Sequence, residues 1–384
     1  MQIKSLVKKV PLIKPDLPPF DAVEGPFREI LENGRVTNFG KYAVQFEQEV
    51  GAYLRGATAL AISSGTMGLI FALQAAGLKQ GQKVVLPSFS FMATAQAILY
   101  AGGVPCFADV DETLTLAPQD LERYLDNHPE VFGVVPVHLY GLPCQVEAIQ
   151  DVVDRAKRKT SRSIALIYDA AHAFGAARNQ VRVGNFGDAE VFSLSATKAL
   201  AAVEGGLVTS RNEELIRQIS KMRNYGIEKN YDSYWPGLNG KLSEFHAIIG
   251  LENLKRLDEN LAVRAKRAAY YTRLIEEKTS FLTLPLPSGV THTFKDFTVL
   301  VPPHLKQKRD AIIDFLSQQE IETRAYFYPP IHEQNYFKRF RDRSLPMTED
   351  FSKRVITLPF FTSISETEME YVIDQLLQAE RNFS

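Results

Sequence analysis

The chain has 384 residues, of which 45% are hydrophobic and 23% charged, a composition typical of a globular protein and not of a disordered one. Lys and Arg number 44 against 45 Asp and Glu, so the formal net charge of −1 leaves neither nucleic acid nor an anionic membrane as an expected partner. No apolar run approaches the length of a membrane span, and the segment MQIKSLVKKVPLIKP lacks the apolar core of a signal peptide. The only cysteines are Cys106 and Cys144, which could form one disulfide but favour a reducing cytoplasm in a chain of this size.

Short apolar runs alternate with helical patterns over the first half of the chain. The strands we expect are residues 59–63, 83–87, 104–108, 131–137, 164–168, 190–194 and 206–210. Helical patterns cover residues 66–78, 91–101 and 145–158. This alternation predicts an α/β fold with a mainly parallel sheet between helices, and such folds place their chemistry beyond the carboxyl ends of the strands.

The pattern changes after Gly240. Residues 242–277 predict a long helix with one possible break, and its basic stripe is interpreted as a solvated helix face rather than a diphosphate site: Arg264, Lys266, Arg267 and Arg273. Prolines then punctuate shorter elements, with helices expected at residues 307–320 and 366–380. We therefore expect a large domain over residues 1–250, with an N-terminal segment, and a smaller C-terminal α/β domain over residues 251–384.

Three loops that follow predicted strands carry chemistry-bearing residues. The loop Ser63-Ser64-Gly65-Thr66 offers backbone N–H groups and hydroxyls to an anion, or is simply a helix N-cap with a turn glycine. Asp169 ends an apolar strand, where a carboxylate needs a positive partner or caps the next segment. Lys198 follows a buried strand among small side chains, where a lysine is either structural or a nucleophile with a lowered pKa.

Taken together, these three features predict a site for pyridoxal 5′-phosphate (PLP). Lys198 would hold the cofactor's aldehyde, Asp169 would keep its pyridine nitrogen protonated, and the loop would bind its phosphate. Each group answers a separate need of this cofactor. We expect no metal site.

Further motifs occur in order along nearly the whole chain. They are Thr37-Asn38-Phe39-Gly40, Phe46-Glu47, Ser64-Gly65-Thr66, Pro87 to Thr94, Gly102 to Pro105, Pro136 to Gly141, Asp169 to His172, Ser193 to Lys198, Glu204-Gly205-Gly206, Arg223 to Gly226, Leu238-Asn239-Gly240, Ser243-Glu244, Tyr326 to His332 and Leu358-Pro359. In this set the chain resembles the DegT-type nucleotide-sugar aminotransferases, which have the aspartate-aminotransferase fold. The large domain is accordingly expected to bind PLP.

The resemblance implies roles for single residues. Lys198 would hold the cofactor and move the proton between it and the substrate, and Asp169 would pair with the pyridinium nitrogen. Phe91 and Ala171 would cover the two faces of the ring. The other cofactor-binding residues that it implies are Ser64, Gly65, Thr66, His172, Ser193 and, from the neighbouring subunit of a homodimer, Asn239. It also implies substrate contacts from Thr37, Tyr326 and His332.

Several alternatives stay open at single positions. Phe91 could be an ordinary core aromatic residue, and His332 either lines the sugar pocket or is a surface histidine. His138 is interpreted as a structural histidine. Ser195 stands where many relatives have histidine, which alters the pocket beside the cofactor and leaves the sugar that fits there open. Lys241 stands where arginine is common, and neither departure removes a residue that would hold PLP.

The predicted function is the transfer of an amino group, with glutamate as the donor, to a nucleotide-linked keto sugar. A free keto sugar or keto-cyclitol is the alternative substrate, and a PLP-binding regulatory protein without turnover is the rival class. Relatives that aminate C-4 tend to carry Phe-Ser-x-x-x-x-Lys followed by Glu-Gly-Gly. Phe192-Ser193, Lys198 and Glu204-Gly205-Gly206 match that pattern, so C-4 is favoured over C-3.

Overall fold

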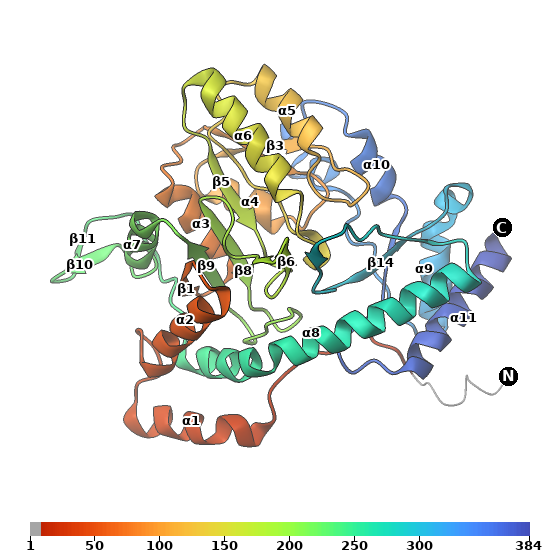
Figure 1. Cartoon of the computed structure of the whole chain (residues 1–384), viewed down its shortest axis with the longest axis horizontal. Coiled ribbons are helices and arrows are strands. Elements are labelled where there is room, and N and C mark those ends of the chain that lie inside the picture. Colours follow the sequence, from red (N-terminus) through yellow and green to blue (C-terminus); the bar gives the residue numbers. More distant parts are fainter. Residues whose placement is uncertain (1–8) are drawn as a thin grey trace.

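A seven-stranded sheet forms the centre of the larger part of the molecule (Figure 1). The structure is a computed structural model that describes residues 9–384; residues 1–8, part of the segment in which no signal peptide is expected, lie outside the described residues. The sheet has the order β1-β9-β8-β5-β4-β2-β3. Its strands are β1 (Thr58–Ile62), β2 (Lys83–Pro87), β3 (Val104–Ala108), β4 (Gly133–Val134), β5 (Ala165–Asp169), β8 (Ala189–Ser193) and β9 (Gly206–Ser210).

The sheet is mainly parallel. Strands β8, β5, β4, β2 and β3 run in one direction, and β9 is antiparallel to both of its neighbours, β1 and β8. Successive side chains point to opposite faces, so Val84 and Leu86 join one apolar cluster while Val85 joins another. Both faces are therefore buried, as a parallel sheet requires. The predicted fold class is confirmed.

Helices cover both faces. One face packs against α3 (Gly65–Ala75), α4 (Ala93–Tyr100) and α7 (Glu213–Met222). The other face packs against α2 (Lys41–Leu54), α5 (Pro118–Asn127), α6 (Val146–Thr160) and the first part of α8 (Glu244–Lys278). Helix α1 (Phe20–Asn33) lies against α8, where Phe27 and Phe245 meet edge to face with their ring centroids 5.3 Å apart.

Helix α8 links this part to a smaller one and crosses the lower part of Figure 1. The smaller part has an antiparallel sheet, β12 (Leu282–Thr283), β14 (Phe297–Leu300) and β15 (Val355–Leu358), which packs with α9 (Arg309–Gln318) and α11 (Glu366–Phe383). The same stretch of the chain also contains the 3-10 turns η3 (Pro303–Lys308), η4 (Ile331–Glu333) and η5 (Lys338–Phe340), and helix α10 (Pro346–Ser352).

Two segments cross the expected boundary between residues 250 and 251. Val10 bridges to Ile321 and joins the apolar cluster of the smaller part. In the other direction, Ile331, Phe337 and Leu345 pack into the cluster on the α3 face of the large sheet. The two parts are thus tied together by chain crossing in both directions, and the division into two domains stays a prediction.

The remaining elements are short. They are the strands β6 (Ala177–Arg178), β7 (Val181–Arg182) and β13 (Val290–Thr291), which form a small sheet, the hairpin β10 (Ile227–Lys229) and β11 (Asp232–Ser233), and the 3-10 turn η2 (Leu139–Gly141). The β10–β11 hairpin projects from the body of the molecule (Figure 1), and its Tyr231 side chain is 94% exposed.

Four expected elements differ from the observed ones. Strand β4 is only two residues long because Pro136 has no N–H for the ladder, although Val137 still bridges to Asp169. The helix expected from residue 91 begins at Ala93, which leaves Phe91 in the preceding loop. The long helix α8 is continuous, without the expected break, and residues 307–320 divide into the end of η3 and α9.

The interpretation of the basic stripe as a solvated helix face is wrong for Arg264. Arg264 is only 4% exposed, and its guanidinium donates to the carbonyl oxygens of Thr293 and Phe294 at 3.2 and 2.5 Å. Asp16 lies 3.8 Å from it. Arg264 therefore links α8 to the segment before β14. Helical spacing along the sequence gives no information about that segment, so it predicted an exposed side chain.

As expected, no helix within residues 9–384 is long and apolar enough to cross a membrane.

Candidate active site

One cavity of about 190 Å³ gathers the chemistry-bearing loops of the large sheet. It lies beyond the carboxyl ends of β5 and β8 and at the N-terminus of α3, where an α/β sheet is expected to bind ligands. Nine of the ten residues predicted to bind the cofactor line this cavity: Ser64, Gly65, Thr66, Phe91, Asp169, Ala171, His172, Ser193 and Lys198. Asn239 is the exception.

The loop after β1 leads into the start of α3 and borders the cavity. Ser64 caps α3 through its side chain, which accepts from the Met67 N–H at 3.2 Å, and the first helical residues, Gly65 and Thr66, line the cavity. A side chain at Gly65 would lie 3.2 Å from the Phe192 carbonyl oxygen and from Ser193 Cβ. A side chain at Gly206 would lie 2.5 Å from the Gly65 nitrogen. Both glycines are therefore needed for the close approach of β8, β9 and the loop.

Asp169 ends β5 with its carboxylate buried and only neutral donors upon it. Thr94 Oγ1 donates to Oδ2 at 2.6 Å, and the Ala171 N–H donates to Oδ1 at 3.0 Å. Burial raises the pKa of Asp169, and these hydrogen bonds oppose that rise without cancelling it. A cationic partner supplied by a ligand would reverse the direction of the shift.

Lys198 lies in the loop that connects β8 to β9 and borders the same cavity. Burial of its amino group and the positive charge of Lys295 lower its pKa to about 7, against the opposite influence of Asp296 and Asp169. Burial, together with the charges of Lys198 and Lys295, also lowers the pKa of His172 well below its usual range. At neutral pH the cavity therefore contains a largely neutral imidazole and an amine that is readily deprotonated.

An aromatic wall of three side chains, Phe91, Phe327 and Tyr326, continues from the cavity lining toward the smaller part, and of these Phe91 lines the cavity itself. Phe91 is 51% exposed, and its ring centroid lies 6.1 Å from that of Phe327, which in turn lies 6.5 Å from the His172 ring. Tyr326 stacks on Phe327, and its carbonyl oxygen accepts from the Tyr140 hydroxyl. The core-aromatic alternative for Phe91 is wrong, because the helix begins after it and leaves the ring facing the cavity.

Four predicted site residues are not among those that line this cavity: Thr37, Asn239, Tyr326 and His332. Asn239 and Thr37 are exposed, and neither lines it. His332 is fully buried rather than a surface histidine, with its Nδ1 at 2.6 Å from Ser88 Oγ. Their predicted roles in substrate or cofactor binding stay predictions.

His138 is a structural histidine, as the sequence indicates. It is fully buried, its Nε2 lies 2.9 Å from Glu190 Oε1, and its Nδ1 accepts from the Cys144 N–H at 3.0 Å. Its ring stacks on Tyr168 with 5.1 Å between the centroids. Both ring nitrogens are thus engaged inside the fold.

Sequence reasoning missed two features of the site. Thr94 holds Asp169, and it lay within the motif from Pro87 to Thr94 without an assigned role. Lys295 pairs with Asp296 at 2.7 Å, both nearly buried, and acts on Lys198 through its charge. This pair had no local signal, because it comes from the smaller part of the chain and meets the cavity only after folding.

The groups around the cavity fit PLP. The helix start provides N–H donors for a phosphate, the Asp169 carboxylate has no charged donor among its hydrogen bonds, and Lys198 has the lowered pKa that an amine needs to react with an aldehyde. These are the three groups by which proteins hold this cofactor.

Comparison with known proteins identifies relatives of the same length. Three proteins align with most of the chain: a pleiotropic regulatory protein of Geobacillus stearothermophilus, 32% identical, covering 93% of this chain and 94% of that protein; a dTDP-4-amino-4,6-dideoxy-D-glucose transaminase of Shigella dysenteriae, 31% identical, covering 96% and 98%; and a UDP-N-acetyl-3-dehydro-alpha-D-glucosamine 3-aminotransferase of Acidithiobacillus ferrooxidans, 32% identical, covering 86% of each.

A solved structure and a family model agree with these relatives. The crystal structure of DesI in the presence of its TDP-sugar product matches with a TM-score of 0.90 and 29% identity, covering 98% of this chain and 94% of that one. The model of the DegT/DnrJ/EryC1/StrS aminotransferase family matches residues 22–377. The chain belongs to this family and is a PLP-dependent aminotransferase.

Proposed function

We propose that this enzyme moves an amino group from glutamate to the ketone of a nucleotide-linked sugar, with C-4 as the favoured position. The observation that carries the proposal is the single cavity that joins the anion-binding loop, Asp169 and Lys198. The relatives that act on dTDP- and UDP-linked sugars support the substrate class.

PLP supplies an aldehyde and an electron-withdrawing ring. Gly65 and Thr66 at the start of α3 and the Ser193 hydroxyl would bind its phosphate, with Ser64 capping the helix. Asp169 would keep a proton on the ring nitrogen, and Thr94 donates a hydrogen bond that orients the carboxylate. Phe91 and Ala171 would cover the two faces of the ring, and His172 lines the same cavity.

Lys198 acts as the proton carrier. With its pKa lowered to about 7, its amine is partly neutral at physiological pH and takes a proton from the α-carbon of the amino donor. The same amine then returns a proton to the sugar carbon that receives the nitrogen. Lys295 keeps this pKa low, so it is a positioning residue for Lys198.

The sugar enters from the open side of the cavity, toward the aromatic wall. Tyr326 contributes to that wall, and Thr37 remains a candidate for contact with the substrate, whereas the His332 side chain is fully buried. Ser195 lines the cavity where many relatives have histidine, which leaves more room beside the cofactor. The loop from Ser193 to Gly206 supports amination at C-4, and the 3-aminotransferase relative makes C-3 the alternative to test.

The functional unit is a homodimer with shared sites. Asn239 is exposed, does not line the cavity of its own chain, and bridges to Asn224, so these two residues lie at the base of the segment that contains the β10–β11 hairpin. Exposed apolar side chains surround this hairpin: Tyr225, Tyr231, Tyr234 and Leu238. A second copy covering them would place Asn239 at the phosphate of its neighbour.

The free thiols of Cys106 and Cys144 support a cytoplasmic enzyme.

The rival function is a regulatory protein without turnover, as the name of one relative suggests. The decisive measurement offers glutamate alone to the PLP-loaded protein and follows the cofactor absorbance. We expect conversion to the pyridoxamine form in the wild type and none in Lys198→Ala. An unchanged wild-type spectrum would favour the regulatory function.

The substrate is tested with matched 3-keto and 4-keto forms of one nucleotide sugar, and with the free keto sugar as a control. Nuclear magnetic resonance then locates the new amine. We expect the 4-keto nucleotide sugar to be converted at least about tenfold faster than the other two, because the loop near Lys198 determines which ketone reaches attack distance. Amination confined to C-3, or to the free sugar, would contradict the proposed specificity and leave the transaminase assignment intact.

A further inference from the structure

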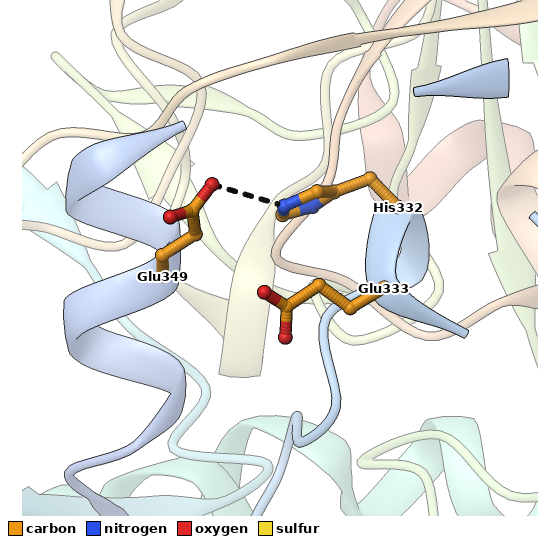
Figure 2. Close-up of side chains that lie close together, drawn as sticks. All are labelled: His332, Glu333 and Glu349. Atoms are coloured by element: carbon orange, nitrogen blue, oxygen red, sulfur yellow. Dashed lines mark ion pairs between the residues drawn. The ribbon is translucent and has the colours of Figure 1, made fainter. Parts of the chain in front are cut away.

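Three metal-ligating side chains converge outside the cofactor cavity (Figure 2). His332 and Glu333 come from the 3-10 turn η4, and Glu349 comes from α10. One ligand atom from each of them lies within 4.8 Å of the other two. Residues that are adjacent in one turn thus meet a helix that follows later in the chain, beside the first large cluster of the core.

The imidazole ring of His332 is held in place through its Nδ1 atom. Its Nδ1 lies 2.6 Å from the Ser88 hydroxyl at the end of β2, and its own backbone N–H donates to the same oxygen at 3.0 Å. The residue is fully buried, and the second nitrogen, Nε2, has no hydrogen-bond partner. A histidine held through one nitrogen with the other free and directed toward carboxylates is the arrangement that metal-binding histidines adopt.

Glu349 does not satisfy Nε2. The distance from Nε2 to Glu349 Oε1 is 3.5 Å, longer than a good hydrogen bond. That oxygen already accepts from Arg341 Nη2 and the Leu345 N–H, each at 3.0 Å, and from the Ser344 hydroxyl at 3.2 Å. A buried nitrogen without a partner costs free energy, so a cation between the ring and the carboxylates would stabilise the fold.

We propose that His332, Glu333 and Glu349 bind one divalent transition-metal ion of the Zn²⁺ type. One imidazole nitrogen and two carboxylate oxygens form a ligand set that Zn²⁺ accepts, with water in the fourth position. Ligands of a tetrahedral ion lie roughly 3.4 Å apart, which the Nε2–Oε1 pair already meets. Glu333 is only partly buried, and one of its carboxylate oxygens lies within 4.8 Å of the other two ligand atoms, so binding needs it to move closer to them.

The ion has a structural role. It joins η4 to α10, and through Ser88 it fixes both to the edge of the large sheet. Phe327, whose ring lies 6.1 Å from that of the cavity-lining Phe91, comes a few residues before η4. Arg341 competes with the ion, because its guanidinium neutralises Glu349 in place of the metal. Its removal should therefore strengthen metal binding.

The test measures retained zinc. The PLP-loaded wild type and its variants are equilibrated with excess Zn²⁺, desalted, and analysed by atomic emission. We expect about one equivalent in the wild type and at least fivefold less in Glu333→Gln. This substitution is suitable because Glu333 is partly exposed and the fold does not depend on it for core packing. The matched control is Glu130→Gln at the exposed His128–Glu130 pair, 3.4 Å apart, and it should retain as much zinc as the wild type.

Two further results decide the proposal. Arg341→Gln should bind Zn²⁺ at least threefold more tightly than the wild type in a competition titration with a chelator. Zn²⁺ should raise the midpoint of thermal unfolding of the wild type by about 2 °C or more, and leave that of Glu333→Gln unchanged. Equal zinc retention by the wild type and Glu333→Gln, or retention far below one equivalent in both, would overturn the proposal. None of these readouts depends on the sugar substrate.

Discussion

Asp169 and Glu190 are buried carboxylates on the neighbouring strands β5 and β8, yet the fold completes them in different ways. Glu190 is fully enclosed: His138 Nε2 lies 2.9 Å from Oε1, and the Phe186 N–H donates to Oε2 at 2.8 Å. The Gly184 N–H also donates to Oε2. Asp169 has one hydroxyl and one N–H donor, and burial raises its pKa.

The difference separates a structural acid from a cofactor-binding one. Every partner of Glu190 comes from its own chain, so its interactions are complete on folding. Asp169 faces a cavity and lacks the cation that a buried carboxylate favours, and the protonated ring of PLP supplies that charge. Each prediction below changes one side of this comparison, from the largest expected effect to the smallest.

Replacing the lysine of the cavity should have the largest effect. Lys198→Ala removes both the anchor of the cofactor and the proton carrier, so we expect turnover to fall by at least about 10³-fold. The measurement is steady-state transamination together with the absorbance of the bound cofactor. The control is Lys159→Ala on the exposed side of α6, which should bind PLP normally. Near-normal activity of Lys198→Ala would refute the assigned role.

Asp169→Asn tests the acid that lacks a cationic partner. The amide oxygen still accepts from the Ala171 N–H, and the Thr94 hydroxyl must turn to accept from the amide NH2. A neutral amide cannot stabilise a cationic ring, so we expect kcat to fall by about 10²-fold with some cofactor retained. Because the substitution also removes a buried charge that has no cationic hydrogen-bond donor, the midpoint of thermal unfolding of the cofactor-free protein should stay the same or rise. Activity within a few-fold of the wild type would contradict the role.

Glu190→Gln tests the acid whose hydrogen-bond partners all come from the protein. It should lower the free energy of unfolding and leave kcat nearly unchanged. The substitution leaves the His138 ring and two backbone N–H groups facing an amide, so we expect a loss of about 2–3 kcal/mol in the free energy of unfolding. Chemical denaturation of the cofactor-free protein measures this. The folded fraction should keep a kcat within a few-fold of the wild type; a larger loss would place Glu190 in the chemistry.

The pH dependence of cofactor capture sharpens the electrostatics of the cavity. Only the neutral amine attacks the aldehyde, and the pKa of Lys198 is lowered to about 7. The rate of PLP uptake should therefore fall about tenfold for each pH unit below about 7 and level off above it. Lys295→Met removes a charge that lowers this pKa, so the profile should move to higher pH. A rate that still rises through pH 9 in the wild type would show that the pKa of Lys198 is that of an ordinary lysine.

The smallest expected signal comes from mixed dimers. Chains with Lys198→Ala and chains with Asn239→Ala are mixed, unfolded and refolded together. With shared sites, one site of each mixed dimer has both native residues, so we expect recovery to about a quarter of wild-type activity. Activity no higher than that of the Asn239→Ala parent would show that each chain forms its own site.

Sequence patterns predicted the parts of the site that are local. The loop at Gly65, the strand end at Asp169 and the loop at Lys198 each follow an apolar strand, and parallel strands bring their carboxyl ends to one edge. The Lys295–Asp296 pair and the His332, Glu333 and Glu349 cluster had no such signal. They depend on how the second part of the chain returns to the first, which no short segment encodes.

Burial was the other quantity that local patterns could not supply. The helical spacing of Arg264 indicates a polar face, and only the packing of the segment before β14 against α8 buries it. Phe91 shows the reverse, because a helix that begins at Ala93 leaves the ring in the cavity.

The sequence by itself determined the alternation of strands and helices, the mainly parallel sheet and the order of the cofactor motifs, because these follow from side-chain periodicity and from residues close along the chain. Only the tertiary structure decided which carboxylate is complete, how far the pKa of Lys198 falls, and which side chains from distant segments meet. Those properties arise from desolvation and from charges brought within a few ångströms of one another, and both exist only once the chain has folded.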